Sequence, residues 1–214
     1  MKRVTNDTTN HTTNHTANHT TNHTTDATAD GTTDRTANAG PGSATASAPR
    51  PAGWSAAPHP VSAPESAALL RRYYTELIVR YYDRPTTDEE VTATLAELPS
   101  DDLARPTGEF LVGRRDGVPV GCVGLRVLDA TTVEMTRMYV VPEARGQGVA
   151  ALLIEAVEGL AVTAFGARLI RLDTRKDLVE ARGLYAKQGY AEIESYNDNW
   201  LADHWFEKKL HRPG

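Results

Sequence analysis

The chain of 214 residues contains a single cysteine, Cys122. One cysteine excludes an internal disulfide and any zinc site built from several cysteines, and a chain without disulfides suits a reducing compartment. No run approaches the roughly 18 consecutive apolar residues of a transmembrane helix. The N-terminus also lacks the apolar core of a secretory signal peptide. These absences predict a cytoplasmic protein with no membrane partner and no bound metal.

An excess of basic residues is missing as well. The first 64 residues carry four basic and four acidic side chains and are neutral. Removing these from the totals of 23 and 28 leaves 19 basic and 24 acidic residues, so the formal net charge of −5 lies on the remainder. This distribution lacks the basic footprint of a nucleic-acid-binding domain. It mildly favours a cationic partner.

Large apolar residues are scarce in the first 60 positions, where only Met1, Val4 and Trp54 occur. Such a segment cannot bury enough apolar surface to offset the entropy that is lost on ordering. We therefore expect residues 1–62 to be a disordered, low-complexity extension. Residues 63–212 are expected to form one domain, which is large enough for a full core.

The extension contains a four-residue repeat from Asn6 to Ala37, with several units of the type Asn-His-Thr-(Thr/Ala). On a helix the histidines, spaced i, i+4, would line one face and bind a metal, but Thr, Asn and Asp are weak helix formers. The Asn-x-Thr triplets match glycosylation acceptors, which have no use without a secretory route. We prefer to interpret the segment as a disordered repeat expansion.

Apolar periodicity predicts a helix over 65–82 and a second helix opened by Thr87, with Glu90 placed for a capping box. Asp116-Gly117 then predicts a hairpin within a three-strand meander. The remaining expected elements are a helix from 149, a strand at 169–172, a helix at 177–188 and strands near 190–195 and 203–210. This order implies an α/β (α+β) fold with a mixed, mostly antiparallel sheet flanked by helices.

The segment Glu143-Ala-Arg-Gly-Gln-Gly lies between a strand and an amphipathic helix. Glycines at a helix N-terminus let an anion approach free backbone N–H groups, where the helix dipole also favours negative charge. The pattern predicts a bound phosphate group at residues 145–150. Gly146-x-Gly148-x-x-Ala151, with Asp173 ending the next strand, imitates a dinucleotide-binding fingerprint. The hairpin-connected strands before it argue against that alternative.

The same segment resembles the signature (Q/R)-x-x-G-x-(G/A) of the GNAT superfamily of acetyl-CoA-dependent N-acetyltransferases, with Arg145, Gly148 and Ala150 at its fixed positions. The stretches V-E-M-T-R-M-Y-V-V-P and A-R-G-L-Y-A-K-Q-G-Y extend the resemblance over residues 65–210. It implies a GNAT fold. It also implies transfer of an acetyl group from acetyl-CoA to a primary amine of a small molecule or peptide, by direct attack on the thioester. The alternative is a non-catalytic module that senses acyl-CoA.

The resemblance also implies where acetyl-CoA binds. Its pyrophosphate would lie on the backbone amides of the turn, and its pantetheine arm would pair like an extra strand with the strand before the turn. Where family members often carry an asparagine, this chain has Leu178, so Thr174 is expected to supply the missing contact. The other implied cofactor-binding residues are Met138, Tyr139, Val140, Arg145, Gly146, Gln147, Gly148, Val149 and Ala150.

Acetyl transfer to an amine requires a base for the ammonium group, donors for the oxyanion and an acid for the thiolate. Tyr185 matches the tyrosine that many family members use as the acid. Without the resemblance it would be interpreted as the aromatic end of a core stripe. Glu134 matches a glutamate used as the base, and a strand charge paired with Arg126 or Arg137 is the alternative. Backbone N–H groups at residues 138–140 are the candidates for the oxyanion donors.

The acceptor is expected near the loop between the last two strands, around Tyr196–Trp200. The candidate substrate-binding residues there are Asp198, Asn199 and His204, and Asp198 and His204 are also alternative bases. Residues 54–62 are rich in Pro and Ala, so the first strand that is usual in the family is expected to be absent. We expect a monomer or a homodimer.

Overall fold

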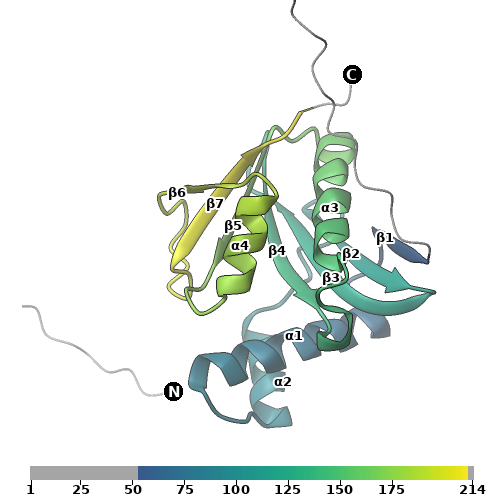
Figure 1. Cartoon of the computed structure of the whole chain (residues 1–214), viewed down its shortest axis with the longest axis vertical. Helices are drawn as coiled ribbons and strands as arrows, with labels where there is room; N and C mark the ends of the chain where they lie inside the picture. The colour runs from purple at the N-terminus through teal and green to yellow at the C-terminus, as the bar shows by residue number, and fades with distance from the viewer. Residues whose placement is uncertain (1–52, 212–214) are drawn as a thin grey trace, which may run out of the picture. The chain divides into compact units, whose positions relative to one another are not determined.

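The computed structural model describes residues 53–211, and Figure 1 shows their arrangement. A seven-stranded sheet has the order β1-β2-β3-β4-β5-β7-β6. The strands are β1 (Trp54–Pro58), β2 (Gly108–Arg115), β3 (Val118–Val127), β4 (Thr132–Val140), β5 (Leu169–Thr174), β6 (Ala191–Ile193) and β7 (His204–Lys209). The expectations for the four-residue repeat lie outside the described residues. The expected fold class, a mixed and mostly antiparallel sheet, is confirmed, since only β4 and β5 pair in parallel.

The first four strands form an antiparallel meander. Asp116 and Gly117 have φ values of 48° and 83°, as a tight two-residue hairpin turn requires. The expectation that the sheet begins one strand short is wrong, because Trp54–Pro58 pairs along its whole length with β2. Its Pro and Ala residues fit an edge strand, where a missing N–H donor costs nothing on the solvent side. The folded region therefore begins before residue 63.

The helices are α1 (Pro64–Tyr82), α2 (Asp88–Glu97), α3 (Val149–Phe165) and α4 (Val179–Lys187). The predicted capping box opens α2, since Thr87 Oγ1 accepts from the N–H of Glu90 and the Glu90 carboxylate accepts from that of Thr87. A side chain at Gly121 of β3 would meet Leu153 of α3, whereas one at Gly124 would meet Leu103, which follows α2. The helices thus cover both faces of the sheet. In Figure 1, α1 runs below the strands from the side of β1 to that of α4.

None of the described helices has both the length and the apolar character needed to cross a bilayer.

Candidate active site

β4 and β5 pair only between Thr132–Glu134 and Leu169–Arg171. Beyond these residues the two strands separate, and Figure 1 shows β4 and β5 diverging toward α1. A bulge in β4, where Arg137 adopts a φ of 52°, helps to turn the strand away. We call the unpaired part of β4 from residue 135 to 140, together with residues 172 to 174 of β5, the fork.

The fork leaves backbone groups of β4 without a strand partner. The N–H of Val141 donates to the carbonyl of Val120 on β3. Since peptide groups along a strand point alternately to its two sides, those of Val140 point toward the fork. Of the residues predicted to hold the pantetheine arm, Met138, Tyr139 and Val140 all lie in this part of β4. The fork therefore offers a strand edge inside the sheet.

The glycine turn lies at the end of β4 and opens α3. Gly146 and Gly148 have φ values of 72° and 86°, in the left-handed region that favours glycine. A side chain at either position would meet no atom within 4 Å, so the backbone is open to a ligand. The first N–H groups of a helix have no partner within it, and no side chain caps α3 at Gly148. The turn brings together the predicted residues Arg145, Gly146, Gln147, Gly148, Val149 and Ala150, and its N–H groups can bind an anion.

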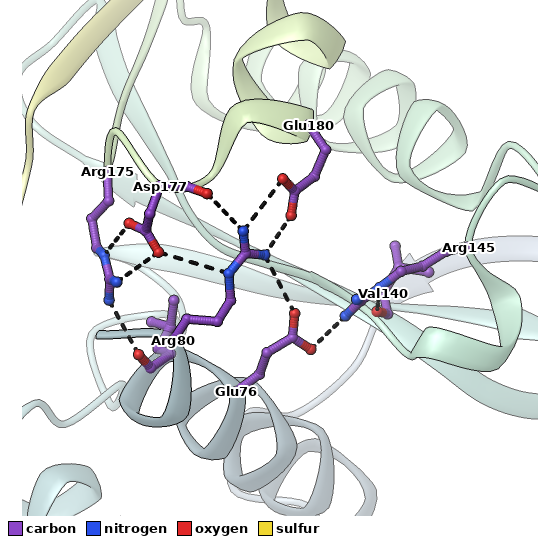
Figure 2. A network of polar contacts seen from close by, with 8 residues as sticks. Glu76, Arg80, Val140, Arg145, Arg175, Asp177 and Glu180 are labelled. Carbon is purple, nitrogen blue, oxygen red and sulfur yellow. Dashed lines mark hydrogen bonds and ion pairs between the residues drawn. The ribbon is translucent and has the colours of Figure 1, made fainter. Parts of the chain in front are cut away.

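Ion pairs connect α1 to the segments that follow the two strands of the fork, as Figure 2 shows. On the β4 side, the Arg145 guanidinium binds the Glu76 carboxylate and donates from Nε to the carbonyl of Val140 at 3.0 Å. On the α4 side, Arg80 binds the Glu180 carboxylate and donates to the carbonyl of Asp177 at 2.7 Å. Arg145 thus connects the glycine turn to α1, and α1 spans the open end of the fork, where β4 and β5 are farthest apart.

Tyr185 of α4 is buried among aromatic rings, with ring centroids 5.8 Å from Tyr190 and 5.9 Å from Phe206. Its hydroxyl hydrogen-bonds to no residue between 53 and 211. Burial raises the pKa of Tyr185 above its ordinary value, and the nearby Tyr73 and Asp173 raise it further. The phenol therefore keeps its proton at neutral pH, as an acid requires.

Glu134 is 6% exposed and lies at the last β4–β5 pair. Arg126 donates to its Oε2 at 2.8 Å, and the Tyr196 hydroxyl donates to its Oε1 at 2.9 Å. The pairing with Arg126 is the alternative that the sequence left open. Both carboxylate oxygens of Glu134 thus have partners within the protein.

Asp173 of β5 is a further candidate, which the sequence reasoning considered only as part of a dinucleotide-binding fingerprint. Its carboxylate accepts from the side-chain amides of Asn197 at 2.8 Å and Asn199 at 3.1 Å. The Asn197 amide also lies 3.4 Å from Glu134, and its oxygen accepts from the Trp205 indole at 2.8 Å. The sequence features that could have indicated this cluster are a carboxylate at the end of a strand and two asparagines in the Tyr196–Trp200 loop.

A family model described as Acetyltransferase (GNAT) family matches residues 70–190, more than half of the chain. The chain belongs to the GNAT acetyltransferase family. This membership confirms the resemblance on which the sequence analysis relied.

Individual relatives agree with the GNAT assignment. A protein named IAA acetyltransferase, from Azospirillum brasilense, is 37% identical over 91 residues, which are 42% of this chain and 59% of the relative. The match therefore spans about three fifths of that relative's length. PaiA N-acetyltransferase from Thermoplasma acidophilum, solved with coenzyme A, has a TM-score of 0.58 at 19% identity, over 73% of this chain and 99% of that one. A GNAT acetyltransferase from Elizabethkingia anophelis with acetyl-CoA bound has a TM-score of 0.52 at 15% identity, over 75% and 100%. The two structures show a shared fold.

The remaining predicted residues do not all lie at the same place in the GNAT fold. Thr174 is buried at the end of β5 and Asn199 contacts Asp173, so both adjoin the fork. Asp198 is exposed on the same loop as Asn199. His204 instead lies between Arg182 of α4 and Glu192 of β6, with both contacts at 2.6 Å, and it touches neither Glu134 nor Asp173. His204 is paired in register with Thr174, but its ring is held by Arg182 and Glu192 and contacts neither carboxylate.

A hollow of about 650 Å³ lies at the β6 edge of this GNAT domain. It contains neither Tyr185 nor the glycine turn, and its lining residues are Glu192, Ile193, Glu194, Ser195, Asp203 and Trp205. Among residues 53–211, no group of three or more His, Cys, Asp or Glu side chains is arranged to hold a metal ion.

Proposed function

We propose that this protein transfers an acetyl group from acetyl-CoA to a primary amine of a small molecule or peptide, by direct attack of the amine on the thioester. The observation that carries the proposal is the fork, with an anion-binding turn at its mouth and a free strand edge along one side. A donor with a charged pyrophosphate and an amide-containing arm matches both features.

Different parts of the donor would bind to the glycine turn and to the fork. The pyrophosphate would accept from the N–H groups of the Arg145–Ala150 turn, where the α3 dipole adds to the attraction. The two amides of the pantetheine arm would hydrogen-bond to this edge of β4, including the N–H of Val140, whose carbonyl accepts from Arg145. Two structural relatives were solved with coenzyme A or acetyl-CoA, which supports this choice of donor.

Three groups would carry the chemistry. Backbone N–H groups of residues 138–140, next to the bulge at Arg137, would stabilise the oxyanion as the amine attacks the carbonyl carbon. Tyr185 would protonate the sulfur as the carbon–sulfur bond breaks. Glu134 stays a prediction as the base, directly or through water, although its contact with Arg126 counts against it.

The acceptor would enter over the face that carries Glu134 and Asp173. These carboxylates and the net charge of −5 favour an acceptor that arrives as an ammonium ion. Asp198 and Asn199, on the loop beside Asp173, would contribute to its binding. The His204 ring is held by Arg182 and Glu192 and contacts neither carboxylate, which argues against the predicted role of that residue in acceptor binding.

The proposal is tested by thermal shift with acetyl-CoA, CoA, NAD and ATP, followed by release of the CoA thiol with a panel of amines. We expect stabilisation by acetyl-CoA and CoA, and thiol release that depends on the amine. Binding without thiol release across a broad panel would favour the sensor alternative. Stabilisation by NAD but not by CoA would contradict the proposed donor.

A further inference from the structure

We propose that Asp173 binds the ammonium group of the acceptor and takes its proton before the attack, an inference that rests on the proposed acetyl transfer. Asp173 lies two residues beyond the last β4–β5 pair, where the fork opens. Side chains alternate along a strand, so Asp173 shares a face with Arg171 rather than with the buried Leu172. The loop that carries Asn197 and Asn199 lies over this face.

The two asparagines hold the carboxylate without neutralising it. Asn197 donates to Oδ2 and Asn199 donates to Oδ1, so each carboxylate oxygen receives one neutral donor. A carboxylate has about four lone-pair sites, and two of them remain for a ligand. Asp173 forms no ion pair with any residue in the described range 53–211, and its side chain is only half-buried. A cation is the partner that this group lacks.

Glu134 differs from Asp173 in each of these respects. It is almost fully buried, pairs with the Arg126 guanidinium and accepts from the Tyr196 hydroxyl. A base must reach the proton that it abstracts. Asp173 is the more exposed of the two carboxylates, and the donors from which it accepts are neutral amides. With Asp173 as the base, Glu134 no longer has the role of base that the sequence predicts. Glu134 shares Asn197 with Asp173 through a 3.4 Å contact and would position that asparagine.

Asp173 also lies close to the proposed acid. Its charge contributes to raising the pKa values of Tyr73, Tyr185 and Tyr196, whose side chains come from α1, α4 and the loop. These tyrosines, Glu134, the asparagines and Arg171 are the polar and titratable groups around Asp173. Arg171 lies on the same strand face as Asp173 and is paired with Glu207. Asp173 at the end of β5 and Tyr185 on the following helix α4 thus lie near each other at the fork.

The proton balance is complete with these groups. The ammonium ion gives one proton to Asp173, and the nitrogen lone pair forms a bond to the thioester carbonyl carbon. The carbon–sulfur bond then breaks, the sulfur takes the proton of Tyr185, and Tyr185 regains a proton from the former amine nitrogen through water. Asp173 releases its proton to solvent, so one proton leaves per acetyl group transferred.

The test compares wild-type protein with Asp173→Asn on tyramine, spermidine and lysine methyl ester, with thiol release as the readout. We expect Asp173→Asn to keep its stabilisation by acetyl-CoA and to lose about 100-fold or more in kcat/KM, the usual range for a lost acid or base. Between pH 7 and pH 9 its residual rate on tyramine and spermidine should rise about tenfold per pH unit, as the fraction of free amine does below an amine pKa near 10. The wild-type rate should rise less steeply, because Asp173 takes the proton there, whereas a purely structural role of Asp173 would leave the two pH profiles parallel.

Glu194→Gln is the matched control, because it removes one negative charge from the exposed segment after β6 and should stay within about twofold of wild type. If the wild-type protein transfers acetyl groups and the kcat/KM of Asp173→Asn stays within threefold of the wild-type value, the inference is overturned and the proposed function stays intact. Wild-type protein that binds acetyl-CoA yet transfers to none of the three amines would overturn both.

Discussion

At the scale of single residues, Tyr185 combines a buried ring with a hydroxyl that hydrogen-bonds to no other described residue. Tyr185→Phe should keep the affinity for acetyl-CoA and lower turnover at least about tenfold, because only the proton donor is lost. Burial raises the pKa of Tyr185 above its ordinary value near 10, so the acid stays protonated as the pH rises. Deprotonation of Tyr185 should therefore cause no fall in rate up to pH 9. Steady-state kinetics across that pH range measure both effects.

Tyr190→Phe is the control for this variant. Tyr190 packs against Tyr185 in the same aromatic cluster and lies under the Lys208 ammonium, 5.4 Å from its ring centroid. Removing its hydroxyl should leave turnover within about twofold of wild type. Equal loss in the two variants would mean that the cluster acts through packing, and the role of Tyr185 as an acid would be contradicted.

Some site residues are predictable from sequence and others are not. Gly146 and Gly148 could be predicted, because glycines at the N-terminus of a helix form a local sequence pattern that indicates anion binding. Asp173 and Asn197 lie 24 positions apart and meet only because β5 pairs with β7, which positions the loop before it. Long-range pairing of this kind has no local signature in a single sequence.

At the scale of elements, the capping box fixes the start of α2. Thr87→Ala removes the acceptor for the N–H of Glu90 and should lower the free energy of unfolding by about 1 kcal/mol. Urea unfolding measures this loss, and acetyl transfer should not change. Thr94→Ala is the same substitution inside α2 and should be nearly neutral, since Ala is the better helix former. A smaller loss for Thr87→Ala than for Thr94→Ala would contradict the role of the cap.

The ion pairs of α1 should influence donor binding. Arg80→Gln removes the contacts with Glu180 and Asp177 that tie α1 to the α4 side of the fork. We expect the KM for acetyl-CoA to rise about threefold to tenfold with little change in kcat, because more order must be gained on binding. Arg84→Gln, which breaks a pair with Glu90 on α2, is the control and should leave the KM unchanged. Equal effects of the two variants would show that the location of the pair is irrelevant.

Element prediction failed at β1 for a physical reason. Trp54–Pro58 has little apolar periodicity, and its Pro and Ala residues are typical of linkers. The strand is specified by its partner, because β2 offers it a complete register from Leu111 to Arg115. The helices α1 and α3 carry their own apolar stripes, which is why their positions were predicted to within a few residues.

At the scale of the whole molecule, all predicted and proposed site residues lie between Glu134 and His204. Removing residues 1–52 should therefore leave the kcat and the melting temperature close to those of the full chain. Removing residues 1–60 also deletes β1, with the Trp54 ring that lies against Arg115, and should lower the melting temperature by about 5 °C or more. Thermal melts and thiol-release assays of the two truncated proteins check this. Loss of activity on removal of residues 1–52 would assign a role to the repeat.

The fork has a consequence for how this sheet avoids self-association. An unpaired strand edge invites another chain to add a strand, which is the usual route to aggregation. The outer edges are short, with five residues in β1 and three in β6. The longer free edge, in β4, opens inward between two arms that α1 fastens together. A helix that covers a strand edge keeps that edge from pairing with another chain, so the opening proposed to admit the pantetheine arm is also shielded from a neighbouring sheet.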